Sequence, residues 1–323
     1  MTDTRPFRIA IAEGALNNID ELKDRFAATS EFIFGPVSTP DEVAGLTAEA
    51  DAILVGLQPL RSEHMAALSD TVRIVARAGV GLDTIDVKAA SARKVRVVYQ
   101  PNYATNEVAD QAASMALASW RRLEGANYLV RTKGWVPSTE IGPVHALQDS
   151  TLGVLGFGRI GRAVVRRLSP FVARVVVFDA FADRSLDAVE WMNSADELLE
   201  VSNLLTLHLP LLESTHHIID SRAIHLMPDG AVLVNVSRGG LVDEDALAQA
   251  LTSGKLAGAA LDVFETEPLP HESPLRSSPN LLLSPHVAWY SVESSGRLAV
   301  WSIQDVVTFL TSGELTNGSW AND

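Results

Sequence analysis

Three short segments late in the chain carry side chains that could do chemistry. They are Val236-Ser237-Arg238-Gly239-Gly240, Asp262-Val263-Phe264-Glu265-Thr266-Glu267-Pro268 and Ser284-Pro285-His286-Val287-Ala288-Trp289. Each places one reactive residue, Arg238, Glu267 or His286, close to turn-forming glycine or proline. A guanidinium grips a carboxylate with two hydrogen bonds, and a histidine held by a carboxylate suits a general acid or base. The set predicts proton transfer on a substrate that carries a carboxylate.

A glycine-rich segment, Gly156-Phe157-Gly158-Arg159-Ile160-Gly161, lies upstream of all three. It follows an apolar strand-like run, Thr151–Leu155, and precedes a helical run, Arg162–Leu168, which is the setting in which this spacing binds a dinucleotide. Its glycines let the backbone turn tightly and approach a pyrophosphate at a helix amino terminus. Together with the acid–base set, this segment predicts hydride transfer to or from a nicotinamide cofactor.

Asp179 indicates which nicotinamide cofactor is used. It follows the next expected strand, Arg174–Phe178, and comes 18 residues after Gly161. A carboxylate there accepts hydrogen bonds from the ribose hydroxyls and repels a 2′-phosphate. The residues that follow directly, Ala180 and Phe181, include no arginine. The alternative is an ordinary loop aspartate, but we favour the ribose-binding role and hence NAD over NADP.

Other readings of the reactive residues are weaker. An arbitrary arginine is most often part of a surface ion pair, but Arg238 stands between an expected strand end and two glycines. His216 and His217 suggest a metal pair, yet neighbouring side chains seldom point the same way, and no acid or histidine at helical spacing accompanies them. The chain has no cysteine, which excludes disulfides, cysteine metal sites and thiol nucleophiles. We predict no metal.

Composition limits the class of protein and its partners. At 323 residues, with 47% apolar and 20% charged residues, the chain suits about two globular domains. A net charge of -14 argues against nucleic acid and anionic membrane surfaces as partners. The chain shows no basic leader and no apolar run near the roughly 20 residues of a membrane span. A cytoplasmic location is the default expectation.

Apolar strand-like runs alternate with helical patterns along the chain, which predicts parallel sheets covered on both faces. The expected strands are 7–11, 31–34, 52–55, 73–76, 95–99, 151–155, 174–178, 204–207, 231–235, 257–261 and 280–283. Helices are expected at 41–50 and 62–68, one long helix from 106 to about 125, an irregular stretch over 131–149, and a final helix over 291–310. The final helix is expected to return to the first domain. We therefore predict an α/β fold of two doubly wound domains with the active site in the cleft between them.

These segments resemble the D-isomer-specific 2-hydroxyacid dehydrogenase family, which includes phosphoglycerate dehydrogenase, over nearly the whole chain. The likeness rests on the following segments in order: 77–86 (Arg-Ala-Gly-Val-Gly-Leu-Asp-Thr-Ile-Asp), the glycine-rich segment, His208-Leu209-Pro210, 236–244, and the Glu267 and His286 segments. The resemblance implies a Rossmann NAD-binding domain of residues 103–290, inserted in a flavodoxin-like substrate domain of residues 1–102 and 291–323. It also implies a homodimer formed through the NAD-binding domain, which suits the alanine-rich helix after Asn106.

The resemblance implies residue roles as well. Arg238, Glu267 and His286 would be catalytic, with Arg238 on the carboxylate or carbonyl and His286 as general acid or base. Val236 and Asp262 would contact the nicotinamide amide, and Val80 and Gly81 would offer backbone amides to the substrate carboxylate, with Arg77 nearby. The cofactor-binding set comprises Gly156, Gly158, Arg159, Ile160, Gly161, Asp179, His208, Leu209, Pro210, Val236 and Asp262.

Three details narrow the resemblance. Related formate dehydrogenases carry glutamine as the partner of the histidine, so Glu267 favours a hydroxyacid substrate. The Pro-His-x-x-Trp-Tyr-Ser form of residues 285–291 looks like the C-terminal-binding-protein branch, whose members are NAD-responsive corepressors. Trp289 would then lie over the substrate pocket and favour a bulkier or apolar substrate, the alternative being core packing.

Two functions remain open at this point. Members that use phosphorylated substrates tend to place a basic residue just after the third strand, where this chain has Gly56-Leu57-Gln58-Pro59-Leu60. That sequence, and the end of the chain at Asp323 without a regulatory domain, make phosphoglycerate a weaker candidate than other 2-hydroxyacids. The second function is an NAD-sensing interaction protein in which turnover is incidental. Its turnover number would be very low on every acid.

Overall fold

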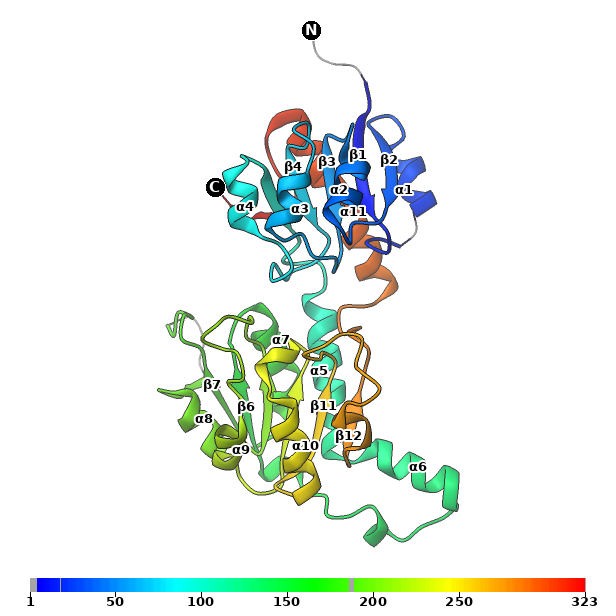
Figure 1. The fold of residues 1–323 in the computed structure, drawn as a ribbon. Coiled ribbons are helices and arrows are strands. Elements are labelled where there is room, and N and C mark those ends of the chain that lie inside the picture. Colours follow the sequence, from blue (N-terminus) through cyan, green and yellow to red (C-terminus); the bar gives the residue numbers. More distant parts are fainter. Residues whose placement is uncertain (1–4, 18, 186–188, 323) are drawn as a thin grey trace. The chain divides into compact units, whose positions relative to one another are not determined.

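The computed structural model describes residues 5–17, 19–185 and 189–322, which fold as two compact units. One unit comprises Met1–Ala104 and Tyr290–Asp323, and the other comprises Thr105–Trp289. Because the chain enters and leaves the second unit once, that unit is an insertion in the first. Each unit has helices on both faces of a mostly parallel sheet, which confirms the predicted fold class (Figure 1).

The sheet of the first unit has the strand order of a flavodoxin-like fold with one strand added at its edge. The order is β13-β5-β4-β3-β1-β2, with β1 to β5 parallel and β13 antiparallel to β5. The strands are β1 (Phe7–Ala12), β2 (Ser30–Gly35), β3 (Ala52–Val55), β4 (Ile74–Arg77), β5 (Arg96–Tyr99) and β13 (Ser319–Trp320). Every residue of β3 and β4 is buried, as expected of strands covered on both faces.

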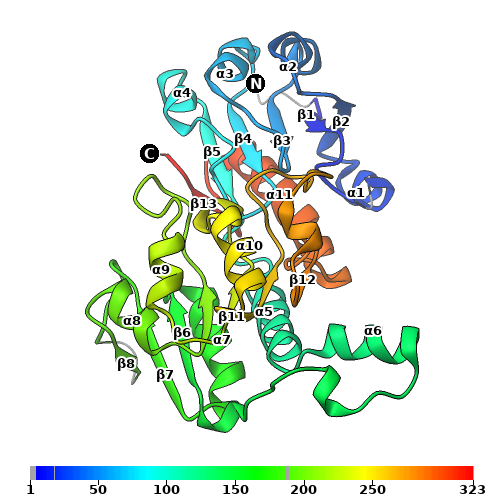
Figure 2. The ribbon, with the colours of Figure 1, turned by 60° about the horizontal axis from the view of Figure 1, so that its bottom comes forward.

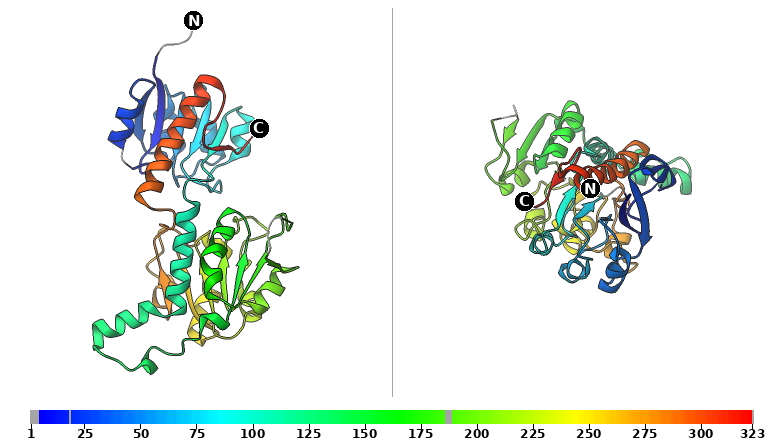
Figure 3. Two further views of the ribbon diagram at one scale, coloured as in Figure 1. Left: turned by 180° about the vertical axis from the view of Figure 1, so that it is seen from behind. Right: turned by 90° about the horizontal axis from the view of Figure 1, so that it is seen from above.

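Helices cover both faces of this sheet. They are α1 (Ile19–Phe26), α2 (Pro40–Thr47), α3 (Ser62–Ala67), α4 (Val87–Ala92) and α11 (Val292–Ser312). α2 and α3 pack together on one face, and α11 crosses the opposite face against β4 (Figures 1 and 3). Ser291 caps the amino terminus of α11, and Gly313, with φ of +83°, ends it. The cap and the glycine explain why the helix runs over these residues.

A buried carboxylate holds the end of the chain to this unit. Asp305 of α11 has no exposed surface, and it accepts the backbone N–H groups of Thr316, Asn317 and Gly318 at 2.7, 2.8 and 2.7 Å. Its Oδ2 also accepts the side-chain N–H of Gln100 at 2.8 Å. These four bonds turn the chain after α11 so that β13 can pair with β5.

The sheet of the second unit has the strand order of a Rossmann fold. The order is β12-β11-β10-β9-β6-β7-β8, with every neighbouring pair parallel. The strands are β6 (Thr151–Leu155), β7 (Arg174–Phe178), β8 (Glu190–Trp191), β9 (Leu204–Leu207), β10 (Ala231–Asn235), β11 (Leu256–Leu261) and β12 (Leu281–Leu283). The direction of the strand order reverses between β6 and β9, the place where open α/β sheets bind ligands.

The helices of the second unit are α5 (Thr105–Trp120), α6 (Leu123–Lys133), α7 (Arg159–Leu168), α8 (Ala195–Val201), α9 (Ser221–Leu226) and α10 (Glu244–Ser253). Short 3-10 turns lie at η1 (Ser138–Glu140), η2 (Leu147–Asp149), η3 (Ser169–Phe171), η4 (Gly239–Leu241) and η5 (Pro274–Ser277). α5 packs on α7, β10 and β11, where its alanines allow a close approach. The body of the unit is thus a sheet with helices on each face.

The prediction of one helix from residue 106 to about 125 is wrong. The helix breaks at Arg122, whose φ of +51° is left-handed, and α6 continues to Lys133 into the stretch predicted to be irregular. The guanidinium of Arg122 bonds to the oxygen of Ile141 and to Oδ1 of Asn280, contacts that lie far away in the sequence. After the break, α6 and the chain that follows project from the body of the unit as an arm (Figure 2).

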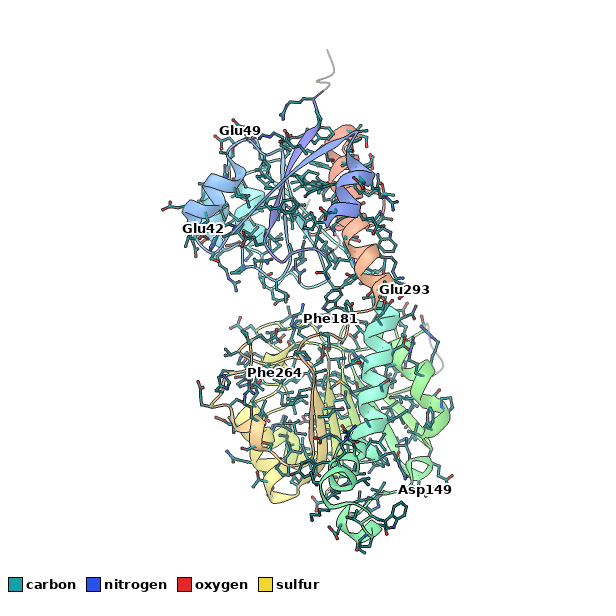
Figure 4. The ribbon with its side chains drawn as sticks, turned by 90° about the vertical axis from the view of Figure 1, so that its right-hand side faces the viewer. Glu42, Glu49, Asp149, Phe181, Phe264 and Glu293 are labelled. Carbon is teal, nitrogen blue, oxygen red and sulfur yellow. The ribbon has the colours of Figure 1, made fainter. Side chains whose placement is uncertain are left out.

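Parallel strands bring their carboxyl ends to one edge of the sheet. In Figure 4, Phe181 and Phe264, which follow β7 and β11, lie at one end of the second unit, and Asp149, which precedes β6, lies at the other. The segments that follow β6, β7, β9, β10, β11 and β12 therefore share an edge. Within the described residues, no helix is long and apolar enough to cross a membrane.

Candidate active site

The glycine-rich turn joins β6 to α7 at this edge. Gly156 has a φ of +95°, and a Cβ there would lie 2.5 Å from the carbonyl carbon of His208, so only glycine fits. A Cβ at Gly161 would lie 2.3 Å from the oxygen of Gly156, whereas none of the described atoms lies within 4 Å of a Cβ at Gly158. No side chain caps the start of α7 at Gly158. Arg159 and Ile160 form the first turn of α7, so their backbone N–H groups suit a pyrophosphate.

Asp179 ties the glycine-rich turn to the end of β7. Its Oδ2 accepts the N–H of Phe157 at 2.8 Å, and its Oδ1 accepts those of Phe181 and Ala182 at 2.8 and 3.1 Å. The carboxylate is partly exposed. Phe181, beside it, is 90% exposed. The structure therefore places a fixed carboxylate at the carboxyl end of β7, beside the glycine-rich turn, and its contact with a ribose stays a prediction.

The segment His208-Leu209-Pro210 follows β9 and lies beneath the glycine-rich turn. Nε2 of His208 bonds to Oγ1 of Thr206 at 2.9 Å. Burial lowers the pKa of His208 to about 3, so its ring is neutral at ordinary pH. Leu209 packs against the apolar core of the unit, and Pro210 is exposed. His208 thus supports the turn with its backbone.

Arg238 stands on a turn after β10 that a buried asparagine closes. Nδ2 of Asn235 donates to the oxygen of Arg238 at 2.8 Å, and Oδ1 of Asn235 accepts the N–H of Ser237 at 3.0 Å. Ser237 donates its hydroxyl to the oxygen of Leu207 on β9 at 2.7 Å. Val236 is buried beneath the turn. The sequence did not single out Asn235 or Ser237, although an asparagine at a strand end was a signal for such a turn.

The turn that carries Glu267 lies directly against the Arg238 turn. A Cβ at Gly239 would lie 1.8 Å from the carbonyl carbon of Phe264, so the two backbones touch there. The N–H of Phe264 donates to Oε1 of Glu267 at 3.0 Å, which leaves Oε2 for another donor. The glycine after Arg238 is therefore required by the approach of the second turn.

Glu267 and His286 are in direct contact. Oε2 of Glu267 lies 2.7 Å from Nδ1 of His286, and the side chains are 31% and 22% exposed. Burial alone would raise the pKa of Glu267, but the bonds from His286 and Phe264 and the charge of Arg238 outweigh it and hold this pKa below its ordinary 4.5. Glu267 is therefore ionised at neutral pH beside a ring that can accept or donate a proton.

Asp262 fixes the turn that carries His286. It has no exposed surface, and its carboxylate accepts the N–H groups of Val287 and Ala288 at 3.0 and 2.8 Å together with the hydroxyl of Ser284. Its backbone oxygen accepts the N–H of His286 at 2.7 Å. Burial raises the pKa of Asp262, while those hydrogen bonds oppose the rise. His286 itself has a φ of +52°, so this network holds a left-handed residue in place.

Trp289 folds back on the same turn. Its Nε1 donates to the oxygen of His286 at 3.1 Å, and its side chain is partly buried. This bond fixes the indole next to the histidine. The proposed contact of Trp289 with a substrate stays a prediction.

The substrate-binding residues predicted upstream lie in the other unit, at the end of β4 and in the loop that follows it. Arg77 is buried, and its guanidinium donates to the oxygens of Ala78 and Gly81, the latter at 3.0 Å. Gly79 has a φ of +144°, and a Cβ there would meet the Arg77 guanidinium at 2.3 Å. Val80 is 40% exposed. Arg77 thus shapes the loop whose backbone N–H groups at Val80 and Gly81 were predicted to bind a carboxylate.

His216 and His217 do not form a metal cluster in the described part of the chain, where no three metal-ligating side chains gather. The two rings stack on each other with their centres 3.9 Å apart. Nε2 of His217 bonds to Glu265. Sequence reasoning missed this pair because its members lie 48 residues apart.

The geometry of the second unit is that of a nucleotide-binding oxidoreductase, and comparison with known proteins defines the family. The model of the D-isomer specific 2-hydroxyacid dehydrogenase NAD-binding domain matches residues 113–288. The chain belongs to this family, whose members are NAD-dependent D-2-hydroxyacid dehydrogenases.

Relatives and solved structures are similar to this chain over most of its length. A glyoxylate reductase of Korarchaeum cryptofilum is 35% identical over 312 residues, covering 93% of this chain and 90% of the relative. A D-3-phosphoglycerate dehydrogenase of Mycobacterium tuberculosis is 36% identical over 277 residues, 85% of this chain but only 52% of the relative, so the chain spans about half the length of that enzyme. The solved structure of an NADPH-dependent glyoxylate/hydroxypyruvate reductase from Sinorhizobium meliloti, in complex with NADP and malonate, is 30% identical with a TM-score of 0.87, covering 98% of this chain and 97% of that one.

Proposed function

We propose that this chain interconverts a D-2-hydroxyacid and its 2-oxoacid with Arg238, Glu267 and His286 as the catalytic set. The 2.7 Å contact between Glu267 and His286 carries the proposal, because it occurs on a turn that buried Asp262 holds in a left-handed conformation. Arg238 stands on the adjoining turn, and its charge acts on Glu267. These three groups supply the acid–base and carboxylate-binding functions that the reaction needs.

Each residue has a defined task in the mechanism. NAD, when bound, supplies the hydride acceptor or donor. Glu267 holds the Nδ1 proton of His286, so Nε2 is the ring atom that exchanges a proton with the substrate oxygen. In oxidation Nε2 takes the hydroxyl proton, and in reduction the charged ring returns it to the oxygen that forms. Arg238 binds the substrate carboxylate or carbonyl through its guanidinium.

The cofactor site fits NAD. The turn at Gly156 can approach a pyrophosphate because no side chain fills it, and the first residues of α7 present backbone N–H groups. Asp179 would accept the ribose hydroxyls and repel a 2′-phosphate, which favours NADH over NADPH. Val236 and Asp262 would contact the nicotinamide amide. The NADP bound by the Sinorhizobium relative makes this preference worth measuring.

The apolar side chains of the substrate loops favour an acid with an uncharged side chain. Leu57, after β3, is 53% exposed, and Val80, after β4, is 40% exposed, so apolar side chains occupy these strand ends. Val80 and Gly81 would bind the carboxylate through backbone N–H groups. Glyoxylate and hydroxypyruvate, the substrates named for relatives of this chain, have uncharged side chains or none. Phosphorylated acids are the weaker candidates.

A panel of 2-oxoacids assayed with NADH tests the proposal. We expect rapid reduction of at least one 2-oxoacid whose side chain is uncharged. The Arg238→Lys variant should lose efficiency on that acid and keep its affinity for NADH, because an ammonium cannot make two parallel bonds to a carboxylate. Full activity of this variant would contradict the role of Arg238. Very slow turnover on every acid would favour the NAD-sensing interaction protein instead.

We also propose that two copies associate through the arm of the second unit. α6 buries none of its residues, and Tyr128, Val130 and Trp135 are 63, 55 and 97% exposed. So much exposed apolar surface on one arm is typical of an interface. Sedimentation should give a dimer that Tyr128→Glu or Trp135→Glu weakens. A monomer would contradict association through the arm.

We expect the enzyme to work in the cytoplasm.

A further inference from the structure

A pair of side chains outside the proposed catalytic set joins two of the turns that carry it. His217 lies between β9 and α9, and its Nε2 bonds to Oε1 of Glu265. Glu265 lies two residues before Glu267 on the same turn. The pair therefore ties the β9–α9 segment to the turn that holds the partner of His286.

The backbone of His217 is bonded to the other catalytic turn. Its N–H donates to the oxygen of Gly240 at 2.8 Å, two residues beyond Arg238. Alongside, Ile219 and Val242 form a parallel bridge that continues this contact. His217 thus contacts the Arg238 turn with its main chain and the Glu267 turn with its side chain.

The conformation of His217 indicates that its side chain has a task. Its φ is +50°, a region that glycine adopts freely and that a residue with a Cβ occupies rarely. The ring of His216 stacks on it with an interplanar angle of 27°. A glycine would serve the backbone better, so the imidazole is what this position gains from histidine.

The second contact on the Glu265 turn comes from α10. Oε1 of Glu244, at the start of α10, accepts the N–H of Glu265 at 2.8 Å. Burial raises the pKa of Glu244, the N–H of Glu265 opposes this, and the carboxylates of Glu265, Asp245 and Glu267 raise it further. The carboxylates are therefore crowded, and an imidazole that donates to Glu265 offsets their repulsion.

The titratable groups that face the His217–Glu265 pair, or that act on Glu267 beside it, come from five segments. They are Glu244 and Asp245 of α10, Glu267 of the same turn, His216 of the β9–α9 segment, Arg238 after β10 and His286 after β12. The protonation of these groups depends both on the charge of Glu265 and on the positions of the turns, so variants that change the charge alone are needed beside variants that break the contact.

We propose that His217 and Glu265 are positioning residues that fix the distance between the Arg238 turn and the Glu267 turn. With both turns held, Glu267 meets Nδ1 of His286 while Arg238 keeps its place beside it. The inference rests on the proposed roles of Arg238, Glu267 and His286. It adds two residues that act on the reaction through the turns that they join.

The test is the pH–rate profile of 2-oxoacid reduction by the His217→Gly variant. Glycine fits the φ of +50°, so the thermal midpoint should not fall. We expect kcat to drop roughly 10-fold, because a small misplacement of catalytic groups has a large effect on rate. The KM for NADH should not change. The alkaline limb of the profile should move to lower pH, because a displaced Glu267 stabilises charged His286 less.

Four further variants make the outcome decisive. Glu265→Ala should reproduce the effect of His217→Gly, and the double variant should be no worse than either. Glu265→Gln keeps a group that bonds to the imidazole and removes the charge, so its profile should match the original enzyme. The matched histidine control is His225→Gln, at an exposed position of α9, where the ring bonds to the oxygen of Ser221 in the same helix, and it should leave the reaction unchanged.

Each other result overturns the inference. Unchanged kcat and pH profile in both His217→Gly and Glu265→Ala would leave the pair without a role in the reaction. If the alkaline limb of the pH–rate profile moved to lower pH in Glu265→Gln as well, the charge of Glu265 would influence the reaction, and the positions of the two turns would not explain the effect. His286→Ala is measured in the same assay. If it keeps full activity, the proposed catalytic set fails, whereas its inactivity beside unaffected His217→Gly removes only the positioning role.

Discussion

Two fully buried aspartates, one in each unit, accept backbone N–H groups in the same way but have different roles. Asp305 accepts three consecutive backbone N–H groups, from Thr316 to Gly318, and so fixes the chain end that forms β13. Asp262 accepts the N–H groups of Val287 and Ala288 and a serine hydroxyl, and so fixes the turn of His286. A buried carboxylate that accepts several backbone N–H groups is a way to hold a segment that no strand or helix holds.

The difference lies in what the held segment carries. Asp305 serves a two-residue strand that pairs at the edge of a sheet. Asp262 serves a histidine with a φ of +52° whose ring contacts Glu267. Losing the first anchor should affect stability alone, whereas losing the second should affect stability and catalysis together.

The largest effect that this comparison predicts is that of His286→Ala. Removal of a general acid–base should slow oxidation and reduction by roughly 10²–10⁴-fold. The thermal midpoint should change little, because the anchor bonds of Asp262 go to backbone groups and to Ser284. Steady-state rates in both directions and a thermal scan check this. Rates within a few fold of the original would mean that the held turn carries no catalyst.

The matched pair Asp262→Asn and Asp305→Asn compares the two anchors directly. Asparagine keeps one acceptor and turns its amide toward N–H donors, so each change should destabilise the fold by about 1–3 kcal/mol. Asp262→Asn should in addition lower kcat roughly 10–100-fold, as the His286 turn loses its fixed position. Asp305→Asn should keep its kcat. Urea unfolding and kcat at a temperature where both variants are folded give the two quantities.

The comparison would be wrong if the two variants behaved alike. Equal losses of kcat would mean that general loosening of the fold is what slows the reaction. An unaffected kcat in Asp262→Asn would mean that His286 keeps its place without the carboxylate. Either result would remove the distinction between the anchors.

Local patterns predicted the fold well, and tertiary contacts explain the failures. Eleven strands, β1 to β7 and β9 to β12, lie within one or two residues of the predicted ranges because runs of valine, isoleucine and leucine mark them locally. The break at Arg122 could not be predicted, since it depends on Ile141 and Asn280, and no glycine or proline marks it. The two-residue strands β8 and β13 are too short for any pattern to mark.

The candidate site divides in the same way. Arg238, Glu267 and His286 could be picked out because each stands beside glycine or proline in a short segment after an expected strand. Asn235 closes the Arg238 turn and His217 bonds to Glu265, but neither contact shows in the sequence because each needs the folded turns. Asp262 was predicted to meet the nicotinamide, while its bonds to the His286 turn became visible only in the structure.

Glu267→Gln tests how the carboxylate beside the anchored turn acts. Because the pKa of Glu267 is held below its ordinary 4.5, the carboxylate is ionised through neutral pH and stabilises charged His286. The glutamine variant keeps a bond to Nδ1 without the charge, so the alkaline limb of reduction should move to lower pH. Because folding lowers the pKa of Glu267, its ionised form also contributes to the free energy of unfolding. This contribution is present above about pH 4.5 and is lost as the pH falls through the lowered pKa.

The pH–rate profiles of both directions check this prediction. The original enzyme should favour reduction on the acid side and oxidation on the alkaline side, with one group controlling both. Profiles that coincide for the two proteins would mean that Glu267 does not act on His286 by its charge. The 2.7 Å contact would then serve only to orient the ring.

The smallest effect concerns a third aspartate, Asp179, which shares features of both anchors. It accepts the N–H groups of Phe157, Phe181 and Ala182, yet its carboxylate is partly exposed, so it can also meet a ligand. The original enzyme should prefer NADH over NADPH by at least ~10-fold in kcat/KM, about 1.4 kcal/mol. Asp179→Asn, which keeps an acceptor but loses the charge, and Asp179→Ala, which loses both, should shrink this preference. If Asp179 is only an anchor like Asp305, each variant will lose the same fraction of its kcat/KM with NADH and with NADPH, and the ratio of the two values will stay constant. A lower ratio of NADH to NADPH efficiency in Asp179→Asn would show that the charge of Asp179 selects the cofactor without a 2′-phosphate.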